Sequence, residues 1–276
     1  MLIEPLLILA LTAAAVLFAA GLLRKSKGVA PSLVDWRRAG FYASGLLVTL
    51  LALLSPIDDA SDRLVSVHMA QHMMLVLIAA PLLAESRFEV AWLWALSPQS
   101  RTRLAHFHGR LRRSTPWRIL ASPGVVWFVF VASFVVWHVP GPYRAALRSP
   151  LLHELEHLSL LLAAILFWNG ALRASGESHR GVAILCVATA AVATGLSGAL
   201  IFFSPHPLYA TPPASEGARV MEDQQIAGLL MWILGDAVYL FFIGRIALGY
   251  FAAENWSCAT APDVSPSPVR LTRDSL

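Results

Sequence analysis

The sequence predicts an all-α membrane protein built as a bundle of seven transmembrane helices. Hydrophobic residues make up 57% of its 276 residues, and Asp, Glu, Lys and Arg make up only 14%, against roughly 25% charged residues in soluble globular domains. The mean hydropathy is +0.63, and the apolar residues form long runs instead of alternating with polar ones. We therefore expect one membrane domain over residues 1–253, followed by a disordered cytoplasmic tail over residues 254–276.

Seven apolar segments come close to the ~20 residues that a helix needs to cross a bilayer. They cover residues 5–23, 39–56, 65–84, 123–139, 151–169, 181–203 and 226–250. Glu4 precedes the first segment at the place where a signal peptide carries basic residues, so we interpret this segment as a helix, with cleavage as the alternative.

Basic residues predict which end of each helix faces the cytoplasm. If the N-terminus lies outside, all but four of the 21 Lys and Arg residues fall on the inner side, as the positive-inside rule requires. The four exceptions are Arg63, Arg144, Arg148 and Arg219. We therefore expect an external N-terminus and a cytoplasmic C-terminus. This placement also accounts for the formal net charge of +4 without nucleic acid as a partner.

Two connecting regions have distinctive compositions. On the inner side, residues 85–122 combine aromatic residues with an Arg-rich stretch, which is typical of an amphipathic segment lying on anionic lipid. On the outer side, residues 204–225 are rich in Pro, Ser and Gly. We expect this loop to fold over the outer helix ends like a lid.

Histidines gather at the expected outer face. Six of the nine lie there: His68, His72, His138, His153, His157 and His206. His68 and His72 are four residues apart, and His153 and His157 repeat this spacing, which puts each pair on one helical face. Polar groups within a span usually face the bundle interior and mark a functional site. Imidazoles that merely cap a helix end at the interface are the alternative, and they explain one pair more readily than two.

The ligand types indicate which ion such a site would hold. Only two cysteines are present and they lie far apart, so a metal would depend on His, Met or carboxylate ligands. Imidazole suits copper and zinc, and thioethers would favour Cu(I), although methionines in apolar helices commonly serve packing. We predict a copper site, with Cu(I) as the expected oxidation state and zinc as the alternative metal. Its expected ligands are His68, His72, His153, His157 and His138, with Met69, Met73, Glu154 and Asp223 in secondary roles.

Two other chemistries are compatible with histidines in a membrane. The stretch from His153 to His157 matches H-E-x-x-H, in which Glu154 would activate water on a zinc ion. An intramembrane zinc hydrolase is therefore an alternative if His68, His72 or His138 supplies the third ligand. Haem fits less well, because histidines one turn apart crowd into a single layer, whereas bis-His haem needs ligands that face each other across the ring.

The last two segments carry small and acidic residues inside the membrane. Gly195 and Gly198 are spaced like small residues at a close helix contact. Asp236 lies in mid-span, where a carboxylate is costly. Its role, in transport or in helix packing, is left open by the sequence.

Several short motifs in order along the chain resemble the CtaG family of caa3-type cytochrome c oxidase assembly factors. The resemblance runs from about residue 40 to 250. The motifs are Ser55-Pro56, His68-Met69-Ala70-Gln71-His72-Met73, Ala80-Pro81-Leu82-Leu83, Trp137-His138-Val139-Pro140, His153 to His157 with Phe167-Trp168, and Asp223-Gln224-Gln225-Ile226-Ala227-Gly228 with Met231-Trp232. The sequence departs from the family pattern at Glu85-Ser86-Arg87, where a Gly-Pro type turn is expected, and at Leu234, where proline is common.

The resemblance implies a non-enzymatic assembly factor in a bacterial cytoplasmic (inner) membrane, one that handles copper for a haem-copper oxidase. Its expected partners are subunits of that oxidase and the lipid bilayer, with a homo-oligomer as the alternative to a monomer. The residues by themselves indicate an outward-facing His/Met/carboxylate cluster, shallow enough for a partner's ligands to reach it. The alternatives to a copper chaperone are the zinc hydrolase and a metal-free assembly scaffold.

Overall fold

The computed structural model describes residues 3–25, 35–61, 63–174, 176–209 and 217–259, and all regular structure in these ranges is helical. Six helices are long and apolar enough to span a membrane, and a bent pair of helices makes a seventh span if it is counted as one. The predicted all-α membrane protein is therefore confirmed. The sidedness derived from the basic residues stays a prediction.

The elements follow the predicted segments, with ends that differ by a few residues. In chain order they are α1 (Ile3–Lys25), α2 (Trp36–Leu54), α3 (Pro56–Ser61), α4 (Val65–Met73), the π-helical turn η1 (Met74–Ala79), α5 (Ala80–Ser86), α6 (Phe88–Ala95), α7 (Pro98–Arg113), α8 (Thr115–Leu120), α9 (Pro123–His138), α10 (Pro140–Arg148), α11 (Pro150–Leu172), α12 (Glu177–Phe202), α13 (Gly217–Leu229), the π-helical turn η2 (Leu230–Leu234) and α14 (Gly235–Ala259).

Two expected boundaries shift. Helix α13 begins at Gly217, so the last part of the expected 204–225 loop is helical. Helix α14 continues to Ala259, past the boundary expected at residue 253, because no Gly or Pro interrupts residues 251–259. The rest of the expected tail lies outside the described residues.

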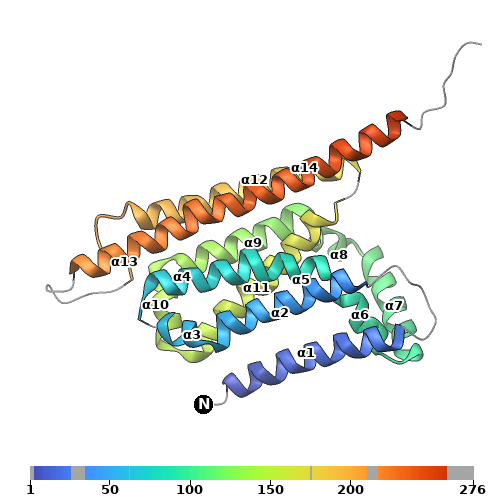
Figure 1. Cartoon of the computed structure of the whole chain (residues 1–276), viewed down its shortest axis with the longest axis horizontal. Helices are drawn as coiled ribbons and strands as arrows, with labels where there is room; N and C mark the ends of the chain where they lie inside the picture. The colour runs from blue at the N-terminus through green and yellow to red at the C-terminus, as the bar shows by residue number, and fades with distance from the viewer. Residues whose placement is uncertain (1–2, 26–34, 62, 175, 210–216, 260–276) are drawn as a thin grey trace, which may run out of the picture.

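The long helices lie side by side with α11 in a central place (Figure 1). Helix α11 contacts α5 and α9, α12 contacts α13 and α14, and α1 packs on α6 at the edge. The short helices gather at the two ends of the bundle. Helices α3 and α10 lie at one end, and α6, α7 and α8 lie at the other.

The span formed by α4, η1 and α5 is distorted around a proline. Pro81 has no amide hydrogen and would clash with the carbonyl four residues earlier in a regular helix. In the wider π-turn the amide of Ala80 bonds to Leu75 O, which leaves Val76 O without its usual helical donor. Trp168 of α11 donates its indole N–H to this carbonyl at 2.8 Å. The distortion thereby ties two spans together.

Close packing of α12 against α13 and η2 depends on glycine. A Cβ on Gly198 would lie 2.8 Å from Gly228 O, and one on Gly228 would lie 2.6 Å from Phe202 N. A Cβ on Gly195 would lie 2.9 Å from the carboxylate of Asp236. The predicted close helix contact at Gly195 and Gly198 is confirmed, and Asp236 faces that same contact.

Both departures from the expected motifs fall where the backbone is irregular. Arg87 connects α5 to α6 with φ of 51°, in the left-handed region where glycine is preferred. The guanidinium of Arg245 pairs with Glu85 at 2.5 Å beside this turn. Leu234 is the last residue of η2. The span formed by α13, η2 and α14 is therefore distorted without a proline.

Helices α9 and α10 form the bent pair. Their axes differ by 72°, and the break lies at Val139. Pro140 follows at the first position of α10. Its missing amide hydrogen costs no helical hydrogen bond there, because the first amides of a helix have no acceptor within it. The bend folds α10 across the end of the bundle, next to α4 and α11 (Figure 1).

Candidate metal centre

Three helices bring the five predicted histidines to one end of the bundle. Helix α4 carries His68 and His72, α11 carries His153 and His157, and α9 ends at His138. The ring centroids of His68 and His72 are 4.4 Å apart, and those of His153 and His157 are 4.5 Å apart. Between helices, the His68–His153, His72–His157 and His72–His138 centroid distances are 5.2, 5.3 and 5.3 Å. The matched spacing on α4 and α11 therefore makes one cluster.

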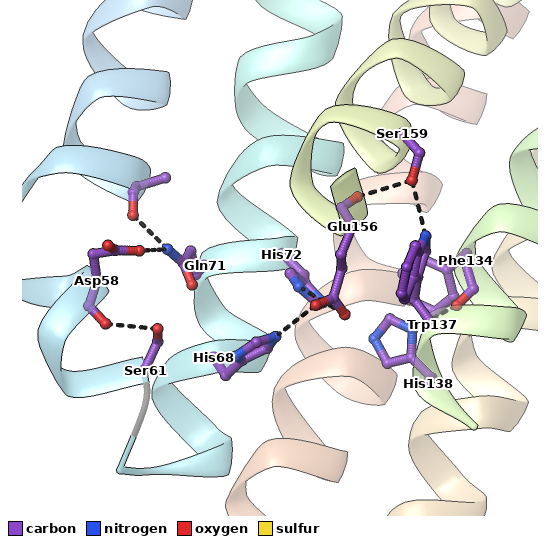
Figure 2. Close-up of polar contacts among 11 residues, drawn as sticks. Asp58, Ser61, His68, Gln71, His72, Phe134, Trp137, His138, Glu156 and Ser159 are labelled. Atoms are coloured by element: carbon purple, nitrogen blue, oxygen red, sulfur yellow. Dashed lines mark hydrogen bonds and ion pairs between the residues drawn. The ribbon is translucent and has the colours of Figure 1, made fainter. Parts of the chain in front are cut away.

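Glu156 of α11 belongs to this cluster, with its carboxylate between the two histidines of α4 (Figure 2). Its oxygens are 3.7 Å from His68 Nε2 and 3.6 Å from His72 Nε2, and all three side chains are fully buried. The H-E-x-x-H motif points to Glu154 and does not include Glu156 as a functional position. Helical periodicity places Glu156 beside the histidines, because residues 153, 156, 157 and 160 share one face of α11.

The ligand atoms form two overlapping groups of three. His68, His153 and His157 make an all-imidazole group, and His68, His72 and Glu156 make a group with one carboxylate. Within each group the ligand atoms lie within 4.8 Å of one another. His68 belongs to both, so the two positions are adjacent.

His138 is oriented by the backbone of its own helix. Its Nδ1 lies 2.6 Å from Phe134 O, and because a carbonyl can only accept, Nδ1 carries the proton. The neutral ring then presents Nε2 as an electron-pair donor. Among the described residues Nε2 has no hydrogen-bond partner although it is buried. Metal-binding histidines usually have this arrangement, with one nitrogen fixed by the protein and the other available.

Other buried polar atoms in the cluster also lack hydrogen-bond partners among the described residues. They are both ring nitrogens of His72, Nε2 of His157 and both carboxylate oxygens of Glu156. Burying such groups without a partner is costly. A bound cation would offset this cost by accepting electron pairs from several of them at once, so the donor set fits a metal ion.

Hydrogen bonds hold the backbone around the cluster. Gln71 donates from Nε2 to Ala52 O at 2.7 Å and to Asp58 Oδ1 at 2.8 Å, which fixes α4 against α2 and α3. On the other side Trp137 donates to Ser159 Oγ at 2.8 Å, and Ser159 donates to Glu156 O at 3.0 Å (Figure 2).

The residues expected in secondary roles lie in different places. The Asp223 carboxylate accepts from Val65 N at 2.7 Å, from Ser66 N at 3.2 Å and from the Ser66 hydroxyl. It thereby satisfies the first amides of α4 and places a negative charge at the positive end of that helix. Met69 and Met73 belong to the main hydrophobic core, and Glu154 is half-buried.

Two tyrosines cover the cluster. Tyr143 of α10 lies edge-on to His68 with centroids 4.9 Å apart, and Tyr209 packs on Tyr143 at 4.2 Å. Tyr209 donates its hydroxyl to His138 O at 2.8 Å. Burial raises the pKa of Tyr209, so the phenol stays protonated as a donor.

The cluster is largely enclosed by protein, and its shallow position in the membrane stays a prediction. His68, His72 and Glu156 are fully buried, whereas His153 is partly exposed. The bend between α9 and α10 contributes to this enclosure, because it lays α10 over the histidines. Of the expected 204–225 lid, Tyr209 contacts Tyr143 and His138, and residues 210–216 lie outside the described part of the chain, so the lid stays a prediction.

These features define a multi-pass helical membrane protein with a buried His/Glu cluster at one end of its bundle. The family model for the cytochrome c oxidase caa3 assembly factor, Caa3_CtaG, matches residues 15–252. The chain belongs to this family. Comparisons with curated proteins and with solved structures find no significant match.

Proposed function

We propose that this assembly factor holds a copper ion at the His/Glu cluster and passes it to a subunit of a caa3-type oxidase in a bacterial inner membrane. The main support is the pair of overlapping three-ligand groups that share His68. Two adjacent positions let an ion change ligands in steps, with no stage at which it is free.

The two positions differ in chemistry and in exposure. The all-imidazole position includes His153, which is partly exposed, and neutral imidazoles suit copper. The position with Glu156 is fully buried and adds a negative charge. We assign entry and exit of the ion to the side of His153, and storage to the side of Glu156.

A test in cells separates copper delivery from scaffolding. A strain lacking this chain is complemented with the wild type, with a variant in which His68, His72, His153 and His157 are all replaced by Ala, or with the control His106→Ala/His206→Ala. The proposal predicts that only the quadruple variant, present at wild-type level in the membrane, yields oxidase deficient in copper and in activity. Normal oxidase with that variant would show a metal-free scaffold.

One observation favours a second candidate, the zinc hydrolase. His68 lies close enough to His153 and His157 to supply the third ligand that H-E-x-x-H requires. That reaction needs Glu154 as general base, whereas copper holding depends on Glu156. The variant Glu154→Gln should abolish function while leaving metal binding intact if the protein is a hydrolase. It should leave oxidase maturation unchanged if the protein carries copper.

A further inference from the structure

A large cavity opens at the end of the bundle opposite the histidine cluster. Its volume is about 1180 Å³, and it lies between α7, α8 and the ends of α9, α11 and α12. None of the histidine-cluster residues lines it, so a molecule bound in this cavity would not depend on copper at the other end.

The rim of this cavity is basic and its wall is apolar. Arg112, Arg173, His108 and His179 lie at the rim, and the lining contains no Asp or Glu. Apolar side chains of the spans, such as Val126, Leu166, Phe167 and Val182, also line this cavity. Cations at a membrane end that lead into an apolar channel between helices are complementary to an anionic lipid.

The two arginines are not equivalent. Arg173 is held by Glu89 at 2.5 Å and donates to Ala84 O at 3.0 Å, so its charge is balanced and its position fixed. Arg112 is exposed on α7, and among the described residues no carboxylate pairs with it. Arg112 is therefore the guanidinium best placed to meet a phosphate.

A third feature points to a hydroxyl-bearing headgroup. Asn169 lines the cavity, and its Oδ1 is buried without a hydrogen-bond donor among the described residues. A buried amide oxygen that lacks a donor is costly. The hydroxyls of a glycerol headgroup would supply that donor while the phosphate lies against Arg112.

We propose that this cavity binds one anionic phospholipid of the phosphatidylglycerol type, with its phosphate at Arg112 and its acyl chains between α9, α11 and α12. The lipid joins α7 and α8, which make few contacts with the spans, to the membrane bundle. The amphipathic segment is thus attached through a specific site in addition to its general affinity for the bilayer.

The experiment titrates detergent-purified protein with dioctanoyl phosphatidylglycerol or dioctanoyl phosphatidylcholine and counts bound lipids by native mass spectrometry. The wild type should bind phosphatidylglycerol about tenfold more tightly, as expected for a charge-assisted contact. Arg112→Gln should remove this preference. Arg113→Gln, one residue further along α7 and outside the cavity lining, should keep it.

A second variant tests the acyl chains without touching a charge. A Cβ on Gly170 meets nothing within 4 Å, and this residue lines the cavity, so Gly170→Leu should fill the chain space and weaken binding by about tenfold. Equal affinity for both lipids, equal losses in Arg112→Gln and Arg113→Gln, or unchanged binding in Gly170→Leu would each overturn the proposal. Binding of inorganic phosphate as tight as that of the lipid would also overturn it, in favour of a free-anion site.

Discussion

At the scale of single residues, Glu156 sets the electrostatics of the histidine cluster. It is fully buried between His68 and His72, and the described residues give its oxygens no hydrogen bond. A carboxyl group buried without a hydrogen bond disfavours the metal-free protein, and its ionised form favours a bound cation. Glu156 therefore links protein stability to metal occupancy.

The substitution Glu156→Gln tests this link. Gln keeps the shape and loses the charge, so the affinity for copper should fall at least about tenfold, while the metal-free protein unfolds at the same temperature or higher. Competition with a Cu(I) chelator and thermal unfolding in detergent measure the two effects. The control Glu154→Gln should change neither the copper affinity nor the unfolding temperature. Equal copper affinity in Glu156→Gln and wild type would show that Glu156 does not bind the metal.

At the scale of elements, the π-turn η1 depends on a side chain from a neighbouring helix. Val76 O, released by the wide turn beside Pro81, accepts from the buried indole of Trp168. A buried carbonyl left without a donor costs about 1–3 kcal/mol. The distorted span that carries His68 and His72 is thus fixed to the span that carries His153 and His157.

Replacing Trp168 with Phe should therefore lower the free energy of unfolding by about 1–3 kcal/mol, seen as a lower midpoint of thermal unfolding in detergent. The matched control is Trp127→Phe, because the Trp127 indole nitrogen has no hydrogen-bond partner among the described residues. If both substitutions cost the same, loss of ring volume and not the hydrogen bond would explain the effect.

Local spacing made some features predictable. The i, i+4 pairs on α4 and α11 put four histidines on inward faces, and the apolar runs defined the spans. Tertiary contacts decided the others. Asp223 caps α4 from 158 residues away along the chain, and the bend at Val139 sets how deeply the cluster is buried. Helical periodicity also predicts Glu156, which shares a face of α11 with His153 and His157. The H-E-x-x-H motif indicates Glu154 instead, two residues earlier.

At the scale of the whole molecule, the two ends of the bundle have opposite chemistry. One end holds the histidine cluster under α10 and Tyr209, and the other holds the basic helix α7 and the cavity at Arg112. The distribution of Lys and Arg predicts that the basic end is cytoplasmic. Copper would then be handled at the outer face of the membrane.

Cysteine labelling tests this orientation. After Cys186 and Cys258 are changed to Ser, single cysteines are introduced as Ser204→Cys near the histidine end and Ser100→Cys in α7. A membrane-impermeant maleimide should label Ser204→Cys in intact spheroplasts and Ser100→Cys only after lysis. The reverse pattern would place the cluster on the cytoplasmic side.

We propose that one cluster shared between α4 and α11 holds copper. The most direct test of this claim is metal content by mass spectrometry of detergent-purified protein after anaerobic loading with Cu(I). We predict stoichiometric copper in the wild type and in the control His106→Ala/His206→Ala. Copper should be lost both in His68→Ala/His72→Ala and in His153→Ala/His157→Ala. Copper retained in either double variant, zinc bound in preference to copper, or no metal in the wild type would contradict the claim.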